Sequence, residues 1–317
     1  MGTVMRKLVI SAALLTAVST GSAMAADLGA KPYYKAPPPV AAFDPWDIAF
    51  GAGIMSDYVF RGVSQSNRQP SVTAYFEPRF NVTKDVQLYV GSSFESISFT
   101  NRAAAEVDIY GGVRFNIGAF SLDFGGWGYI YPGGKCIDGN AGGVPAGLCP
   151  FGSEFLPNGN FMKSDINFYE VYGKAAYTFN DYFSMNASAW YSPNFLNSGA
   201  EGTYATIGAK FTAPSTWFGS SGVGAYLSGE YGYQWLGTTD AFYGFTKLPD
   251  YGTWNVGIGF TYKVFTLDAR YYDTSLSKAD CNVFTGDFTA TFGESKWCGS
   301  TGVVKLSADL TAMQNLK

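Results

Sequence analysis

Apolar and polar side chains alternate residue by residue along most of this chain, and this pattern constrains the fold more than any other feature. In residues 71–82, Val72 and Phe76 fall on one face, whereas Thr73 and Arg79 fall on the other. A period of two is typical of a β-strand whose two faces meet different surroundings. The pattern recurs in about 12 segments between residues 47 and 310. The sequence therefore predicts an all-β fold.

One alternating segment contains a proline, Pro78. Proline has no N–H to donate to a strand ladder, so within sheets it is confined to edges, strand starts and bulges. We therefore expect a β-bulge at Pro78.

Along the chain, short or moderate connections between the alternating segments alternate with longer ones. Residues 83–85 and 118–119 are short connections, whereas Pro132 to Asp165 and Ser275 to Thr301 are very long. Short periplasmic turns and long extracellular loops are typical of outer-membrane barrels. In that arrangement both termini lie on the periplasmic side.

A soluble, exported β-sandwich also has alternating strands and is the alternative fold. The segments run to about 10 residues, which is the length that a tilted strand needs to cross a bilayer. Aromatic residues stand at both ends of apolar faces, as Trp254 and Tyr262 do in one segment and Phe183 and Tyr191 do in another. Such girdles mark the two membrane interfaces, so these features favour the membrane barrel.

Charged residues of both signs recur on the other face of the segments. A basic group near the middle of the lipid costs about 2–4 kcal/mol, so these side chains should point into the lumen. We predict a transmembrane antiparallel β-barrel of about 12 strands. The predicted pore-lining residues are Asp57, Arg61, Glu77, Arg79, Glu106, Asp108, Arg114, Asp123, Glu170, Lys174, Lys210, Glu230, Asp268 and Arg270.

The N-terminus is typical of a secretory signal peptide, with basic Arg6 and Lys7, an apolar run, and small residues at Ala23 and Ala25. We expect cleavage after Ala25. The expected organisation is a signal peptide (1–25), a proline-rich periplasmic leader (26–46), the outer-membrane barrel (47–310) and a C-terminal tail (311–317). The net charge of -4 argues against a nucleic-acid partner.

Four cysteines in an exported chain favour disulfides, for which three pairings are open. Cys136 and Cys149 lie in one long connection, and Cys281 and Cys298 lie in another. The simplest hypothesis is that each pair closes its own external loop. A metal site is the competing interpretation, but the chain has no histidine and no Cys-x-x-Cys spacing. We expect no metal and no cofactor.

The absence of histidine also excludes the His-dependent mechanisms of outer-membrane enzymes, because no side chain with an unperturbed pKa near neutrality can act as the base. Glu106 with Asp108, and Asp268 near Arg270, are nominal acid–base candidates. Their mid-strand position on one face is better explained as lumen charge. We therefore expect that the protein is not an enzyme.

The width of the lumen bears on function. Barrels of about 8 strands are filled by side chains, whereas those of about 16 or more leave an aqueous channel. A barrel of intermediate size allows a narrow pore, which the connection from Pro132 to Asp165 can constrict by folding inward. The first hypothesis is a porin-like channel for passive diffusion of small hydrophilic solutes. The alternative is a structural or surface-interaction barrel with a plugged lumen and no transport role.

The stretch from Ser56 to Ser66 ends the first alternating segment. We place Tyr58 and Phe60 in the outer aromatic girdle, with Asp57 and Arg61 turned to the pore mouth. In the alternative interpretation, Asp57 and Arg61 only satisfy each other or loop backbone at the rim.

This stretch carries a resemblance. Ser56-Asp57-Tyr58-Val59-Phe60-Arg61-Gly62-Val63-Ser64-Gln65, with Pro70 a few residues on, resembles the N-terminal signature of the TorF porin family. Glu106-Val107-Asp108-Ile109-Tyr110-Gly111-Gly112, Gly128-Tyr129-Ile130-Tyr131-Pro132-Gly133 and Glu170-Val171-Tyr172-Gly173 are similar to later blocks of that family. The leader is similar to those of alphaproteobacterial outer-membrane proteins. The resemblance implies a barrel in the outer membrane of a Gram-negative bacterium, with outer-membrane lipid, the barrel assembly machinery and small hydrophilic solutes as partners.

Overall fold

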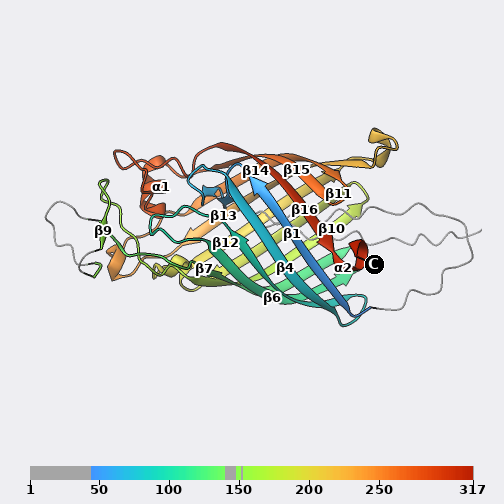
Figure 1. Cartoon of the computed structure of the whole chain (residues 1–317), viewed down its shortest axis with the longest axis horizontal. Helices are drawn as coiled ribbons and strands as arrows, with labels where there is room; N and C mark the ends of the chain where they lie inside the picture. Colours follow the sequence, from blue (N-terminus) through green and yellow to red (C-terminus); the bar gives the residue numbers. More distant parts are fainter. Residues whose placement is uncertain (1–43, 140–147, 151–152, 317) are drawn as a thin grey trace, which may run out of the picture.

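The structure is a computed structural model that describes residues 44–139, 148–150 and 153–316. Within these residues, twelve strands close an antiparallel barrel in the order β1-β16-β15-β14-β13-β12-β11-β10-β7-β6-β5-β4 (Figure 1). The strands are β1 (Trp46–Met55), β4 (Ser71–Asn81), β5 (Val86–Glu95), β6 (Glu106–Ile117), β7 (Phe120–Ile130), β10 (Phe168–Asn180), β11 (Phe183–Ser192), β12 (Gly202–Thr212), β13 (Val223–Leu236), β14 (Tyr251–Tyr262), β15 (Phe265–Thr274) and β16 (Thr301–Thr311). The predicted all-β antiparallel barrel is confirmed.

The two ends of the barrel differ (Figure 1). One end, here named the long-loop end, carries the connections 56–70, 96–105, 131–167, 193–201, 237–250 and 275–300. These include the short strands β2 (Val59–Phe60), β3 (Val63–Ser64), β8 (Ile137–Asp138) and β9 (Glu154–Phe155), and the helices η1 (Phe195–Asn197), η3 (Ala241–Tyr243) and α1 (Lys278–Thr285). The short-turn end carries the connections 82–85, 118–119, 181–182, 213–222 with η2 (Ser215–Phe218), and 263–264. The start of β1 and the C-terminal helix α2 (Ala312–Asn315) also lie there.

Two predicted segments lie wholly or mostly outside this description. The signal peptide 1–25 with its cleavage after Ala25, and the leader up to residue 43, precede the described residues. None of the described helices is long and apolar enough to cross a membrane.

The prediction of a bulge at Pro78 is wrong. The pairing of β1 with β4 runs straight through Pro78. Between β4 and β5, Phe76 pairs with Ser92 and Arg79 pairs with Tyr89 in the same register. Pairing between these two strands is missing only at the two residues between Phe76 and Arg79. The missing N–H therefore interrupts the ladder without the insertion of an extra residue.

The outer surface of the barrel is apolar on every strand, because the alternation turns one face of each strand outward. Exposed apolar side chains on successive strands include Ile54, Phe76, Val90, Ile109, Phe124, Val171, Tyr191, Ile207, Leu227, Ile258, Leu267 and Val304. The aromatic residues that the sequence placed at strand ends, Phe183, Tyr191, Trp254 and Tyr262, are also exposed. A continuous apolar belt of this kind is typical of a barrel surrounded by lipid.

Candidate functional site

The connection between β1 and β4, residues 56–70, lies across the mouth of the lumen at the long-loop end and is here named the plug segment. Its strands β2 and β3 form a hairpin with Arg61 and Gly62 at the turn. The φ angles of Arg61 and Gly62 are 48° and 78°. Positive φ at both central residues is the mark of a type I′ turn, whose twist suits a two-residue hairpin. The local sequence thus presents the Arg61 side chain at the tip.

The Arg61 guanidinium is bound to the far wall of the barrel. Its Nη2 lies 2.6 Å from Glu170 Oε2 on β10, and its Nη1 donates to Gln234 Oε1 on β13 at 2.8 Å. The guanidinium carbon also lies 4.3 Å from the centre of the Tyr204 ring on β12. The side chains of Arg61 and Glu170 are 2% and 0% exposed. This buried ion pair fastens the hairpin to strands that lie across the lumen from β1.

Arg61 stays charged in this position. Burial alone would lower the pKa of Arg61, but the charge of Glu170 and its hydrogen bond outweigh burial and raise the pKa above its usual value.

Gly62 lies against the neighbouring wall. A Cβ atom at this position would stand 2.3 Å from Thr274 Cγ2 and 2.6 Å from Thr253 Oγ1, on β15 and β14. The position therefore requires glycine both for its backbone conformation and for the close approach.

Asp57 organises the base of the plug segment. It accepts hydrogen bonds from the hydroxyls of Ser64 and Ser66 at 2.6 and 2.9 Å, and Arg68 Nη1 lies 3.1 Å from its other oxygen. Arg68 also donates to the carbonyl oxygens of the connection 275–300, including that of Trp297 at 2.9 Å. Asp57 and Arg61 therefore have separate partners and do not satisfy each other.

The placement of Tyr58 and Phe60 is wrong. The strand β1 ends at Met55, and the Oγ of the next residue, Ser56, accepts from Val304 N at 3.0 Å. Tyr58 and Phe60 do not belong to the outer girdle, since Tyr58 is 6% exposed inside the barrel and Phe60 packs edge-on against Tyr129 at 5.8 Å.

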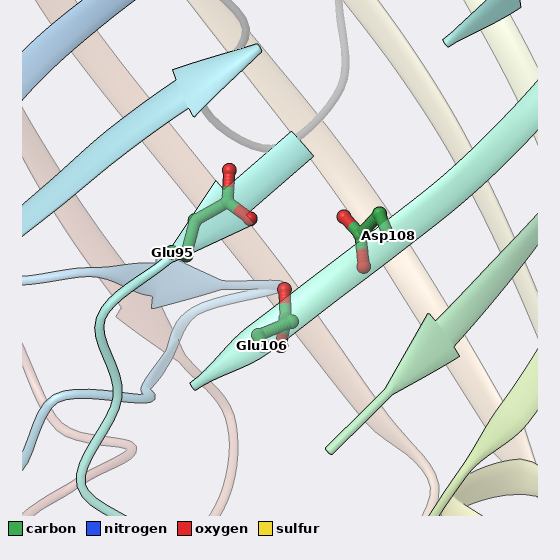
Figure 2. A group of neighbouring side chains, drawn as sticks. All are labelled: Glu95, Glu106 and Asp108. Carbon is green, nitrogen blue, oxygen red and sulfur yellow. The ribbon is translucent and has the colours of Figure 1, made fainter. Parts of the chain in front are cut away.

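Tyr58 reaches a group of three buried carboxyl groups. Glu95, Glu106 and Asp108 point toward one another, and one oxygen of each lies within 4.8 Å of the others (Figure 2). The hydroxyls of Tyr58 and Tyr131 donate to the two oxygens of Glu106 at 2.6 and 2.9 Å. Burial and then the charges of the carboxyl groups raise the pKa of Tyr58 well above its usual value, so its hydroxyl remains a donor.

The carboxyl group of Glu106 is thus the second anchor of the plug segment. Three carboxylates offer oxygen ligands of the kind that Ca²⁺ or Mg²⁺ prefers, but fewer than the six or more that Ca²⁺ takes. Hydroxyl donors already occupy part of this capacity, because Ser93 donates to Asp108 at 2.9 Å and Thr73 to Glu95 at 2.8 Å. The observed contacts make the group an acceptor site for Tyr58.

Deeper in the lumen, four of the predicted residues form one ion-paired cluster. Arg114 contacts both oxygens of Glu77, at 2.7 and 3.0 Å. Arg79 Nε lies 2.6 Å from the same carboxylate, and Asp123 lies 3.4 Å from Arg114 Nε. The charges of this part of the wall are largely compensated by one another.

The other predicted residues lie on β10, β12, β13 and β15. Arg270 binds Asp268 at 3.0 Å on β15. Lys174 lies 4.4 Å from the centre of the Tyr172 ring, and Lys210 lies at the same distance from that of Tyr226. Glu230 is half-buried on β13.

Sequence reasoning missed Glu95, Gln234 and Tyr204. The alternation would have placed Glu95 inside, because Phe94 beside it is exposed to the outside. Gln234 and Tyr204 also point inward, but no signal in the sequence distinguishes them from other polar inward residues. Their importance follows only from the Arg61 contacts.

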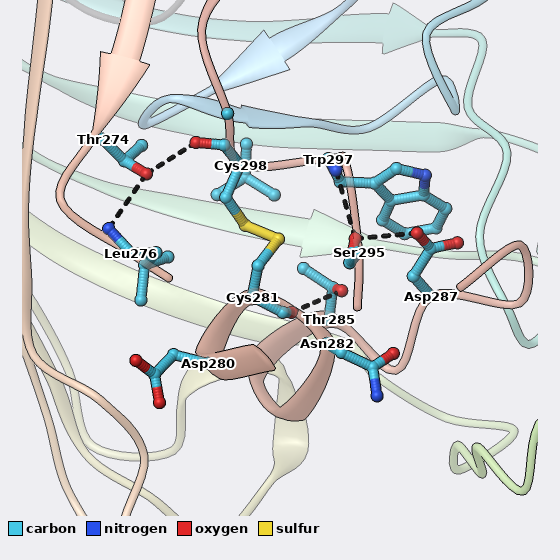
Figure 3. The surroundings of a disulfide bond; sticks show 12 residues. Thr274, Leu276, Asp280, Cys281, Asn282, Thr285, Asp287, Ser295, Trp297 and Cys298 are labelled. Atoms are coloured by element: carbon cyan, nitrogen blue, oxygen red, sulfur yellow. Dashed lines mark hydrogen bonds between the residues drawn. A yellow bond between two sulfur atoms is a disulfide. The ribbon is translucent and has the colours of Figure 1, made fainter. Parts of the chain in front are cut away.

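Two disulfides lie in the long connections. Cys136 is joined to Cys149, and Cys281 in α1 is joined to Cys298 (Figure 3). Cys281 and Cys298 are 0% and 1% exposed within the apolar cluster at the long-loop end, and Thr274 Oγ1 donates to the carbonyl of Cys298 at 2.6 Å. The Cys281–Cys298 disulfide ties α1 to the start of β16.

Replacing both Cys281 and Cys298 by serine is expected to lower the free energy of unfolding by about 3 kcal/mol or more, because the loop closure is lost and two hydroxyls enter an apolar cluster. Urea unfolding followed by tryptophan fluorescence measures this. The pair Cys136→Ser and Cys149→Ser is the matched control: it opens a loop of similar length, 13 against 17 residues, between half-buried positions. A loss no larger than that of the control would contradict the packing argument.

The fold and this site define a class: a closed barrel with an apolar outer surface, a charged lumen and an inward-folded plug. A family model described as a bacterial protein of unknown function (Gcw_chp) matches residues 40–150. No curated protein sequence matches the chain.

The chain is also similar to solved outer-membrane porins and channels. The NanC porin is 8% identical over 84% of this chain and 100% of its own, with a TM-score of 0.45. The COG4313 outer membrane channel from Pseudomonas putida F1 is 11% identical over 88% and 100%, with a TM-score of 0.42. OmpT, an outer membrane protein of Vibrio cholerae, is 12% identical over 86% and 99%, with a TM-score of 0.37.

Proposed function

We propose that the protein is a porin-like channel in the outer membrane of a Gram-negative bacterium, and that small hydrophilic solutes diffuse through it when the plug segment leaves the lumen. The observation that carries this proposal is the ion pair between Arg61 and Glu170, 2.6 Å long and buried. It holds a hairpin across a charged lumen through a side chain of the opposite wall. A contact of this kind has two states, docked and released, and can therefore gate a pore.

The outer-membrane location rests on the apolar belt. Every strand of the barrel exposes large apolar side chains outward, and lipid is the surrounding that makes such a surface favourable. The resemblance to the TorF porin family supports the same proposal. We also propose that the barrel assembly machinery inserts the protein. In this orientation the long-loop end is extracellular and the plug segment closes the outer mouth.

A second candidate function has an observation in its favour. At the long-loop end, buried apolar residues of several connections, among them Val63, Phe99, Phe195, Leu248 and Trp297, form one cluster. A cluster of this kind stabilises a permanently closed lid. The barrel would then be a structural or surface-interaction protein whose long loops are the working part.

We propose no catalytic role for the carboxyl groups. Both oxygens of Glu106 accept hydrogen bonds from tyrosine hydroxyls, and Asp268 is bound by Arg270 and by the hydroxyl of Tyr226 at 2.7 Å. Groups with these partners hold structure in place.

Single-channel recording in planar bilayers tests the channel proposal. The refolded protein is expected to show rare openings, and a variant with residues 58–68 replaced by a glycine-serine linker of equal length is expected to conduct steadily. The control places the same type of linker at residues 215–221, which lie at the short-turn end. A well-folded linker variant at 58–68 without conductance would overturn the channel and leave the plugged barrel.

A further inference from the structure

A cavity of about 340 Å³ lies at the long-loop end between the plug segment and the loops that cover it. All six long connections contribute to its wall, with residues such as Phe60, Phe99, Ile166, Leu196, Leu248 and Phe284. The Cys281–Cys298 disulfide holds α1 (Figure 3). Phe284 of α1 lines the cavity.

The surface of the wall is mainly apolar, although serine, threonine, asparagine and glutamine residues contribute to it. Among the described residues that line the cavity, none carries a charge. Several of its hydroxyls are already used by the protein: Ser198 donates to the carbonyl of Phe195 at 2.6 Å, and Thr246 to that of Tyr243 at 2.8 Å. The wall therefore offers a ligand mostly van der Waals contact and little hydrogen bonding.

We propose that this cavity is a binding site for a small, uncharged, apolar molecule of about the size of two fused aromatic rings. An apolar cavity of about 150 Å³ is enough to bind benzene, so 340 Å³ accommodates a molecule of roughly twice that size. Cavities of this volume with mainly aromatic and aliphatic walls are typical ligand sites.

Two physical arguments favour an apolar occupant. The cavity is partly open to solvent, since Thr246 and Val283 in its wall are exposed, and its mainly apolar wall makes fewer dispersion contacts with water than with an apolar molecule. Water against such a wall finds few free polar partners, so its displacement by an apolar molecule is favourable.

The floor of the cavity links the site to the plug segment. Phe60 and Val63 flank the Arg61-Gly62 turn and also line the cavity. A molecule bound there contacts the docked hairpin, so it stabilises the docked state by its differential affinity. Binding itself does not require that the barrel conduct, so a measurement of binding, and not of conductance, separates this proposal from the channel proposal.

Equilibrium dialysis of radiolabelled naphthalene against the full-length protein in lipid nanodiscs tests the proposal. Val283→Trp on α1 and Thr246→Trp on the connection 237–250 fill the cavity from two sides, and both start from exposed positions. Phe292→Trp is the matched control, because Phe292 is fully exposed in the same connection as Val283 and does not line the cavity. Partition into lipid is the same in all samples, so differences report the site.

The native protein and the control are expected to bind one saturable equivalent of naphthalene, and at least one filled variant is expected to bind at least tenfold more weakly. Unchanged heat-modifiable mobility on electrophoresis checks that each variant is folded. The proposal is overturned if the native protein shows only non-saturable uptake, if both filled variants bind as the native protein does, or if the control loses binding as well.

Discussion

Glu170→Gln is expected to raise the open probability of the channel by at least about 30-fold. The substitution keeps the shape of the side chain but leaves the Arg61 guanidinium buried without its counter-ion. Removing one partner of a buried ion pair costs about 3–5 kcal/mol, and the amide oxygen of glutamine recovers part of this, so about 2 kcal/mol is a conservative figure. The hairpin can avoid this cost by releasing Arg61 into water at the pore mouth, which is the open state.

Single-channel recording measures the effect, and Asp268→Asn is the matched control. Asp268 is also a lumen carboxylate paired with an arginine, but its partners Arg270 and Tyr226 belong to β15 and β13 and not to the plug segment. The control is expected to change the open probability little. Traces of Glu170→Gln that match those of the native protein would show that the ion pair does not hold the plug.

Gly62→Val is expected to release the plug by a steric route. The new Cβ would stand 2.3 Å from Thr274 Cγ2, and threonine on a strand has little rotamer freedom to move away. Valine at a φ of 78° adds backbone strain. Together these effects disfavour the docked hairpin by roughly 3 kcal/mol or more, and single-channel recording should show a channel that is mostly open.

Gly118→Val separates strain from contact. Gly118 also has a positive φ, 62°, but a Cβ there would meet no atom within 4 Å, because the residue lies in the short turn between β6 and β7. We expect the free energy of unfolding of this variant in urea to fall by about 1–2 kcal/mol. Its open probability should remain as low as that of the native protein. If the two glycine variants behaved alike in the bilayer, the contact of Gly62 with the wall would be unimportant.

Most of the barrel could be predicted from the sequence, because apolar and polar residues alternate within each strand according to whether they face outward or into the lumen. In β14, Trp254, Val256 and Ile258 are exposed to the outside, and the inward positions between them are polar or glycine. This local signal repeats in strand after strand and needs no information about distant residues. The prediction of a bulge at Pro78 was wrong because proline only removes an N–H donor, and a strand ladder can lose one hydrogen bond without the insertion of a residue.

The plug segment could not be predicted in the same way. Tyr58 and Phe60 continue the even positions of β1, so the alternation alone placed them on the outside. The turn at Arg61 and Gly62 is not the common Asn-Gly signal of a type I′ hairpin. Its fixed points, Glu170 and Gln234, lie 109 and 173 residues further along the chain, and one sequence does not reveal such pairs.

These long separations also set an order of events during folding. The hairpin can form early, because its two strands are adjacent in the chain, but Arg61 has no partner until β10 and β13 have joined the wall. The mouth is therefore closed only in the last stage of maturation, after most of the wall has been built. A refolding barrel should accordingly pass through an interval in which much of its wall is built and its mouth is still open.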